Sequence, residues 1–502
     1  MYPDLPNEVL SHVFSYVLDE WQKLHYGNDF FPDLWRVRLV CRRWNDLATK
    51  HFFHTVTLWH NINTIEDQFV SWQKLMDSAP VRAAVRRVAI ETAPPDDLDS
   101  CDLSAWPESW IEDGEFPEFV SAVNRIAELP SLNALEVRFN SHCQGREPLD
   151  VDFDDEITPE SPAQPEPTTT RIRTLEIILE MIRKRASTPN MSVIRELELQ
   201  NLQNVPLDKD LTDGLLENIE RLHIGIAYEE RNKFGIYLSE MFEFDPYLQK
   251  TFLPTVADQL VELTISGRRW GAIPGKFDPS SYGMSFPRLK TLCLDNYIIL
   301  QPDQFDWVLE LKSLTKLQLH RCTIATHCLV LQPEFTFWDV DLAGWIRVGD
   351  VIVDDGDRLG RRPLPYQPRL KELKPGWYVS RLRWDTIFDS IREKMLGLKD
   401  FCFDKGCWYM PSRDYDPAYF RDVLFNRYLA FAQAWFELGG IYYARCDHVQ
   451  ENMPGKPQEL LELTEPTDRQ ALSKVLQTVK ERRYRLTAED YTASGGPTLP
   501  DM

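Results

Sequence analysis

The sequence of 502 residues predicts a mixed protein of the α+β or α/β class, with a helical N-terminal module, an irregular solenoid of strand-containing repeats and a C-terminal helical cap. Three observations predict this order. Apolar residues recur at helical spacing near the N-terminus, short apolar-x-x-apolar-x-apolar segments recur between residues 85 and 403, and helical patterns return after residue 411.

The N-terminal module begins with a helix predicted over residues 7–18. Its apolar positions follow one helix face and are Val9, Leu10, Val13, Phe14, Val17 and Leu18. Pro6 suits the first turn, where a missing N–H costs no hydrogen bond, and Glu8 lies near the positive end of the helix dipole. A second helical pattern places on one face Leu34, Val37, Val40, Cys41, Trp44 and Leu47 or Ala48. The alternating "HTVTLW" after it predicts a strand.

Nine segments with the repeat pattern predict short strands. They are "VRRVAI" at 85, "LNALEV" at 132, "IRTLEI" at 172, "IRELEL" at 194, "IERLHI" at 219, "LVELTI" at 260, "LKTLCL" at 289, "LTKLQL" at 314 and "LKDFCF" at 398. Several of the intervals between them fall within the roughly 20–29 residues expected for leucine-rich repeats. Because one repeat strand cannot cover its own apolar face, we expect neighbouring repeats to stack into a solenoid. An ordinary α/β domain with short strands is the alternative.

These patterns divide the chain into six segments. Residues 1–58 form the N-terminal module, 59–142 the first repeat-like segments, and 143–170 an acidic Pro/Thr-rich insertion that is too poor in apolar side chains to fold. Residues 171–410 form the main repeat domain with an irregular insertion at 330–370, 411–486 the helical cap and 487–502 a flexible tail.

The predicted cap contains two helices. The first covers residues 416–438 and buries Tyr419, Val423, Phe431 and Trp435. The second starts with Thr467 or Asp468 as its N-cap and ends in basic residues, which suits the helix dipole.

The composition, with 43% hydrophobic and 27% charged residues, is that of a soluble globular protein. No run approaches the roughly 18 apolar residues of a membrane span. The start of the chain lacks the features of a secretory or transit signal, and nine cysteines without regular spacing indicate reduced thiols. We therefore expect a cytoplasmic and/or nuclear protein without a membrane partner.

The negative charge of the chain is unevenly spread. Of a net charge of −22, residues 91–166 contribute 20 acidic side chains against only Arg125, Arg138 and Arg146. A surface of this sign repels a phosphate backbone, so no nucleic-acid partner is expected. A solvated acidic loop is the favoured interpretation, and attraction of a basic partner is the alternative.

The two N-terminal patterns together resemble the F-box, a short module of packed helices that docks on a Skp-type adaptor. The resemblance covers about residues 3–58 through "DLPNEVLSHVFSYVL", "LWRVRLVCRRWNDLA" and "FFHTVTLW". The matching positions are Leu5, Pro6, Glu8, Leu10, Phe14, Leu39, Val40, Cys41 and Trp44. The linker "DEWQKLHYGNDFFPD" between the halves is longer than is usual in the family. With degenerate leucine-rich-like repeats behind it, the chain resembles the F-box proteins of filamentous fungi.

The resemblance implies a substrate-recognition subunit of a Skp-cullin-F-box ubiquitin ligase. The F-box would bind the Skp-type adaptor and through it the cullin and RING subunits, while the repeats would bind a protein target. The implied adaptor-binding residues are Leu5, Pro6, Glu8, Val9, Leu10, Val13, Phe14, Leu34, Leu39, Val40, Cys41 and Trp44. Among these we expect Leu10, Phe14 and Trp44 to be the anchors. Two alternatives remain open: these residues pack the module onto the repeats, or the chain is a non-catalytic interaction scaffold outside ubiquitin transfer.

No catalytic, cofactor or metal site is expected. The sequence contains no GxSxG, P-loop, GxGxxG or HExxH motif. The nearest approach to a metal pattern lacks a paired CxxC or HxxxH and consists of His320, Cys322, His327 and Cys328, with Cys402 and Cys407 further on. Predicted strand positions on one face form a mixed polar set that favours a protein or peptide target, namely Glu198, His223, Glu262, Cys293, Gln318 and His320.

Overall fold

The computed structural model describes residues 6–14, 37–59, 65–92, 107–140, 143–144, 166–227, 239–267, 277–330, 341–349, 374–404, 427–432 and 457–493. The chain divides into two compact units, which are taken in turn. The first comprises residues 1–203, 207–219 and 409–413, and the second comprises 204–206, 220–408 and 414–502.

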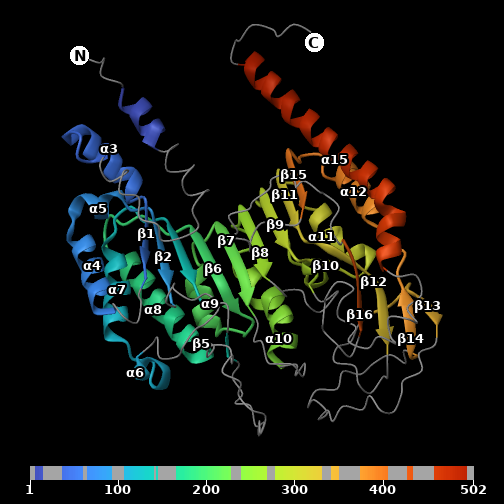
Figure 1. Cartoon of the computed structure of the whole chain (residues 1–502), viewed down its shortest axis with the longest axis horizontal. Coiled ribbons are helices and arrows are strands. Elements are labelled where there is room, and N and C mark those ends of the chain that lie inside the picture. Colours follow the sequence, from blue (N-terminus) through green and yellow to red (C-terminus); the bar gives the residue numbers. More distant parts are fainter. Residues whose placement is uncertain are drawn as a thin grey trace. The chain divides into compact units, whose positions relative to one another are not determined.

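The first unit alternates helices and strands from the N-terminal module onward (Figure 1). In chain order its elements are α3 (Arg42–Phe52), β1 (Thr55–Leu58), α4 (Ile65–Asp77), α5 (Ala79–Ala84), β2 (Arg87–Glu91), α6 (Glu108–Glu112), α7 (Pro117–Arg125), β3 (Ala134–Arg138), β4 (Cys143–Gln144), β5 (Glu166–Pro167), α8 (Thr168–Ala186), β6 (Glu196–Gln203) and α9 (Lys209–Leu216). Strands β1, β2, β3 and β6 form a parallel sheet in that order.

The sheet of the first unit has an apolar and a polar face, because successive side chains of a strand point to opposite sides. Along β6, Leu197 and Leu199 are buried, whereas Glu196 and Glu198, which alternate with them, are only partly buried. On the polar face Arg87 bridges three glutamates from two neighbouring strands: its guanidinium lies 3.1 Å from Glu136 and also contacts Glu196 and Glu198. Helices α4, α7 and α8 lie beside the sheet (Figure 1).

The second unit contains two sheets. In chain order its elements are β7 (Arg221–Ala227), α10 (Ser239–Tyr247), β8 (Glu262–Gly267), β9 (Thr291–Asp295), β10 (Ile298–Ile299), α11 (Asp306–Leu309), β11 (Lys316–His320), β12 (Thr323–Val330), β13 (Ile346–Gly349), β14 (Gly376–Val379), α12 (Trp384–Lys394), β15 (Asp400–Asp404), β16 (Tyr428–Ala432) and α15 (Pro457–Ala493). The first of these sheets is parallel in the order β7-β8-β9-β11-β15.

The register of this parallel sheet stacks apolar side chains across all its strands. Leu222, Leu263, Leu292 and Leu317 occupy matching positions on four strands and are fully buried, and Phe401 continues the row on β15. Eight of the nine predicted strand segments are strands in the two units, which confirms those predictions. The leucine-rich-repeat and solenoid character of the fold stays a prediction.

The segment "IRTLEI" is the exception, because it lies inside the helix α8 and is not a strand. In α8 the buried side chains include Thr174, Ile178, Met181 and Arg185. Their spacing of i, i+4, i+7 and i+11 places them on one face of a helix. The helical spacing continues over the whole of α8, whereas the strand pattern rests on only three apolar positions. Three positions are too few to distinguish a strand from a helix.

The predicted helix over 416–438 is also wrong where the structure describes it. Residues Tyr428–Ala432 form β16, which pairs in parallel with β12. This strand joins a second sheet with the order β10-β12-β14-β13, in which β14 runs antiparallel to β12 and β13. Phe431 is buried in this sheet and packs edge-on against Trp345 at 6.4 Å. Strand β13 lies within the predicted irregular insertion at 330–370.

The last predicted helix exists but is longer than expected. Helix α15 begins at Pro457, so Thr467 and Asp468 lie inside it and not at its N-cap, and it reaches Ala493, within the predicted flexible tail. It packs against α12, β15 and β16. The helical part of the predicted 411–486 cap is thus α15, while β16 belongs to a sheet.

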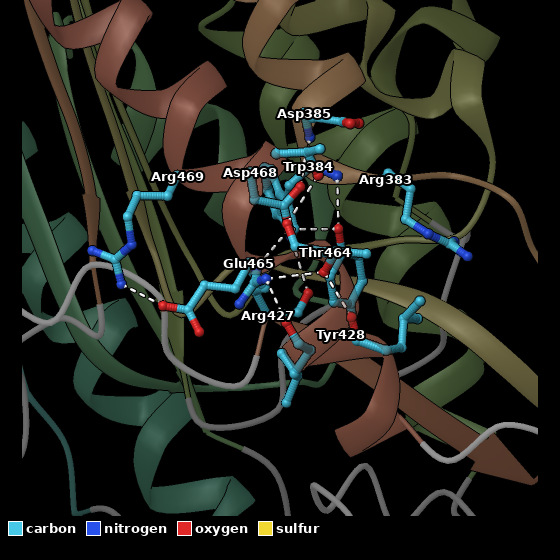
Figure 2. A network of polar contacts seen from close by, with 12 residues as sticks. Arg383, Trp384, Asp385, Arg427, Tyr428, Thr464, Glu465, Asp468 and Arg469 are labelled. Atoms are coloured by element: carbon cyan, nitrogen blue, oxygen red, sulfur yellow. Dashed lines mark hydrogen bonds and ion pairs between the residues drawn. The ribbon is translucent and has the colours of Figure 1, made fainter.

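A buried polar network attaches α15 to its neighbours (Figure 2). Asp468 is fully buried; one carboxylate oxygen accepts from Arg427 Nε at 2.7 Å and from the Tyr428 hydroxyl at 2.8 Å. The other accepts from the backbone N–H of Asp385 at 3.0 Å. Because Asp385 lies in the first turn of α12, Asp468 supplies an acceptor to a helix N-terminus, although it comes from another helix.

The boundaries of the predicted acidic insertion at 143–170 need correction. At its two ends β4 and β5 pair in parallel, and α8 begins at Thr168. Glu166 is buried and accepts hydrogen bonds from Thr92 Oγ1 at 3.0 Å and from the Asn140 N–H at 3.1 Å, next to Arg171. Residues 145–165 lie outside the described residues. In the described part of the chain, no helix is both long and apolar enough to cross a membrane.

Candidate protein-docking site

The described N-terminal residues form two helices joined by side-chain contacts. Residues 7–14 are helical, and the Pro6 carbonyl accepts from the N–H groups of Val9 and Leu10, each at 3.1 Å. Pro6 therefore begins the first turn, as its fixed backbone angle favours. The second helix is α3, whose first hydrogen bond runs from the Asn45 N–H to the Cys41 carbonyl at 2.9 Å.

An aromatic and polar interface holds the two helices together. The rings of Phe14 and Trp44 pack edge-on with centroids 5.6 Å apart, and Phe14 also meets the His51 ring at 6.4 Å. His51 Nε2 lies 2.7 Å from Ser11 Oγ, within hydrogen-bond distance. Leu10, only 3% exposed, is buried in the module. Leu10, Phe14 and Trp44 thus serve first as the inner contacts of the module.

Four large apolar side chains of the module face solvent. Val9 is 43% exposed, Val13 46%, Leu39 83% and Val40 61%. Val9 and Val13 are four residues apart and so share one face of the first helix. Leu39 and Val40 lie in the turn before α3 and are followed by the exposed thiol of Cys41. These four residues, called the exposed apolar set below, are strongly exposed for apolar side chains and are the candidate docking residues of the module.

The turn that carries Leu39 and Val40 is anchored on both sides. Arg38 Nε donates to Asn45 Oδ1 at 3.1 Å, and the Arg38 guanidinium lies over the Phe53 ring, 5.2 Å from its centroid. The Val40 N–H donates to the Val37 carbonyl at 3.3 Å. A fixed backbone lowers the entropy lost on binding, so this turn is suited to present its apolar side chains to a partner.

The module connects directly to the first sheet. Helix α3 packs against α5, and β1 pairs in parallel with β2. At the exit of α3, the His54 carbonyl accepts from the backbone N–H groups of Arg86 at 2.9 Å and Arg87 at 3.0 Å. Residues 55–58, predicted as the end of the N-terminal module, therefore also form the first strand of the sheet.

The structure sorts the predicted adaptor-binding residues by exposure. Val9, Val13, Leu39, Val40 and Cys41 face solvent, as do Pro6 and Glu8, whereas Phe14 and Trp44 are half-buried and Leu10 is buried. The predicted residues Leu5 and Leu34 lie outside the described residues.

Sequence reasoning missed the polar contacts of the interface. Besides Ser11 and His51, Arg43 Nε donates to Asn7 Oδ1 at 2.6 Å. The spacing of His51, seven residues after Trp44 and hence on the same face of α3, was the signal that could have found it.

Comparison with known families matches residues 2–64 to the F-box-like family. The chain therefore carries an N-terminal F-box-like domain, which contains the whole exposed apolar set. No curated protein was found to match the chain.

Proposed function

With the F-box-like domain at residues 2–64 as the premise, we propose that this protein is the substrate-recognition subunit of a Skp-cullin-F-box type ubiquitin ligase. Its F-box-like domain binds a Skp-type adaptor, the adaptor links it to cullin and RING subunits, and the rest of the chain holds a protein target. The protein itself performs no covalent chemistry in this assembly.

The observation that carries the proposal is the exposed apolar set in the matched domain. Burying one Val or Leu side chain contributes about 1.5–3 kcal/mol, so leaving four exposed is costly unless a partner covers them. The Phe14–Trp44 contact holds the helix at residues 7–14 against α3. The apolar side chains on such a pair of helices are suited to bind a partner through amphipathic helices.

The polar side chains on the parallel strands of each unit are compatible with the target-binding part of the proposal. In the first unit these side chains are Arg87 and its three glutamates. In the second unit they include His223 and Thr264, whose side chains lie 2.9 Å apart. Both groups lie on the side of the strands opposite the apolar core. The mixed charge around Arg87, with three carboxylates to one guanidinium, suits a protein partner better than a nucleic acid.

Affinity capture of the tagged chain, with the adaptor and cullin quantified by mass spectrometry, tests the proposal. The variant Val13→Asp/Leu39→Asp should lose both proteins, because each charge must be desolvated in an apolar interface and costs at least about 2 kcal/mol, or about thirtyfold in Kd. Both substitutions change exposed side chains, so the variant should keep its fold, as judged by circular dichroism.

The matched control is Val193→Asp/Leu396→Asp, which adds the same charges at side chains that are 46% and 72% exposed but lie outside the F-box-like domain. It should capture adaptor and cullin like the wild type. Adaptor without cullin would instead indicate an interaction scaffold outside ubiquitin transfer, and capture of neither protein by the wild type would refute the proposal.

A further inference from the structure

Three side chains of the types that bind metal ions meet at the end of the parallel sheet in the second unit. His320 is the last residue of β11, and Cys402 and Asp404 lie on the neighbouring strand β15. The register pairs His320 with Asp404 and Gln318 with Cys402, so all three side chains emerge on the polar face. The residues between them, such as Leu319 and Phe403, are buried on the other face.

The potential ligand atoms of these residues lie close together. One atom from each of His320, Cys402 and Asp404 falls within 4.8 Å of the other two. His320 Nδ1 lies 2.5 Å from one Asp404 carboxylate oxygen, and the Cys402 thiol donates to the other oxygen at 2.9 Å. One carboxylate thus already joins an imidazole and a thiol.

We propose that His320, Cys402 and Asp404 bind a zinc ion. Tetrahedral zinc with ligand bonds of about 2.0–2.3 Å places its ligand atoms about 3.3–3.8 Å apart. The ligand atoms of the three residues lie within 4.8 Å of one another, which is near this range. The distance between His320 Nδ1 and the Asp404 carboxylate must increase by about one ångström to admit the ion. Rotation of the partly buried Asp404 side chain, the more exposed of the pair, supplies such a movement without a change of the backbone.

The donor set favours a transition-metal ion such as zinc over Mg²⁺ and Ca²⁺. Imidazole nitrogen, thiolate sulfur and carboxylate oxygen are the three ligand types of protein zinc sites, whereas Mg²⁺ and Ca²⁺ take oxygen ligands. Three protein ligands leave a fourth position for water. The zinc-bound form of Cys402 is the thiolate, so the ion displaces the proton that the thiol shares with Asp404, and zinc binding releases protons.

Two further features fit the site. The side chains of His320 and Asp404 are 12% and 32% exposed, which gives the ion a route from solvent. Cys293 of the neighbouring strand β9, which the register pairs with Gln318, is also close enough to interact with the His320 imidazole. Metal-binding histidines ordinarily have such a second partner, which fixes the ring orientation, and Cys293 therefore acts as a positioning residue.

This inference departs from the sequence expectation of no metal site. Of the residues in the weak sequence pattern, only His320 and Cys402 come together with a third ligand in the described part of the chain, and Cys407 lies outside it. Cys322 is instead fully buried, and its thiol donates to the Leu294 carbonyl at 3.3 Å. Cys328 is likewise fully buried.

Metal analysis of the purified full chain tests the proposal. The chain is incubated with zinc, and the excess is removed by gel filtration. We then expect one zinc ion per chain by inductively coupled plasma mass spectrometry. The Co²⁺ form should show the near-ultraviolet charge-transfer band of a thiolate ligand. Cys402→Ser should lose both signals, Asp404→Asn should lose the bound zinc, and Cys293→Ala should weaken zinc binding about 10–100-fold.

Matched controls separate the site from general effects. Asp400→Asn removes the same charge from the same strand, and Cys41→Ser removes an exposed thiol elsewhere, so both should keep zinc and the cobalt band. Circular dichroism verifies the fold of every variant. A wild-type chain without zinc, or zinc that persists in folded Cys402→Ser, would overturn the proposal.

Discussion

Arg185, at the end of α8, shows how one buried side chain connects separate segments of the first unit. Its guanidinium donates to the carbonyls of Leu129, Leu132 at 3.1 Å and Ser192 at 2.9 Å, which belong to the loops before β3 and β6. Burial lowers the pKa of Arg185 to about 10, so the side chain is still charged at neutral pH. It therefore supplies charge-assisted hydrogen bonds to backbone acceptors that have lost contact with water.

Replacing this side chain should be costly. Arg185→Met removes the charge-assisted donors from several carbonyls and leaves part of their hydrogen-bonding capacity unfilled, and we expect a loss of about 3 kcal/mol in the free energy of unfolding, measured with urea. Arg185→Lys keeps the charge but not the planar fork of donors, so it should recover only part of the loss. An unchanged stability of the Met variant would show that water replaces these contacts.

The backbone at position 267, at the end of β8, has a conformation that requires glycine. Its φ is +145°, and a Cβ atom there would lie 2.4 Å from the carbonyl oxygen of Ile226 on the adjacent strand. We expect Gly267→Ala to destabilise the fold by about 1–3 kcal/mol in urea unfolding. Gly349→Ala is the matched control, because its Cβ would meet nothing within 4 Å, and it should change stability by less than about 0.5 kcal/mol.

At the scale of the element, α15 depends on Asp468. Asp468→Asn leaves the buried guanidinium of Arg427 without its carboxylate, and we expect a loss of about 3–5 kcal/mol in the free energy of unfolding. Glu465→Gln, one turn away, removes an ion pair with Arg469 that is half exposed on both sides (Figure 2), and should cost less than about 1 kcal/mol.

The companion variant Arg427→Met shows whether the cost of Asp468→Asn comes from the unpaired charge. Combined with Asp468→Asn it should be less destabilising than the sum of the two single changes, because neither buried charge then remains alone. Simple additivity in this double-mutant cycle would mean that the two side chains act independently.

At the scale of the whole molecule, adaptor docking and zinc binding should be separable. The exposed apolar set lies in the first compact unit, and His320, Cys402 and Asp404 lie in the second. We expect Val13→Asp/Leu39→Asp to keep its zinc, and Cys402→Ser to capture the adaptor like the wild type. Loss of both properties in either folded variant would indicate coupling between the units.

Local features, whose signal lies within a few residues, can be predicted from the amino-acid sequence. The N-terminal helix, predicted over 7–18 and described over 7–14, and eight of the predicted repeat strands follow from apolar spacing, because a strand or helix with one buried face requires that spacing. The F-box-like character, predicted over about residues 3–58 and matched over 2–64, follows from short motifs. Among the predicted docking residues, sequence spacing gave the apolar face but not its division into the buried Leu10 and the exposed Val9 and Val13.

Features that depend on residues distant in sequence become visible once the chain is folded. Residues 172–177 are helical and 428–432 form a strand because an apolar run fits either state until its neighbours bury one face or pair with its backbone. His320 and Asp404 are far apart in sequence, and no motif joins them; the parallel register of β11 and β15 does. Asp468 looks like a cap for its own helix, yet it caps α12, since hydrogen bonds are made by proximity in space.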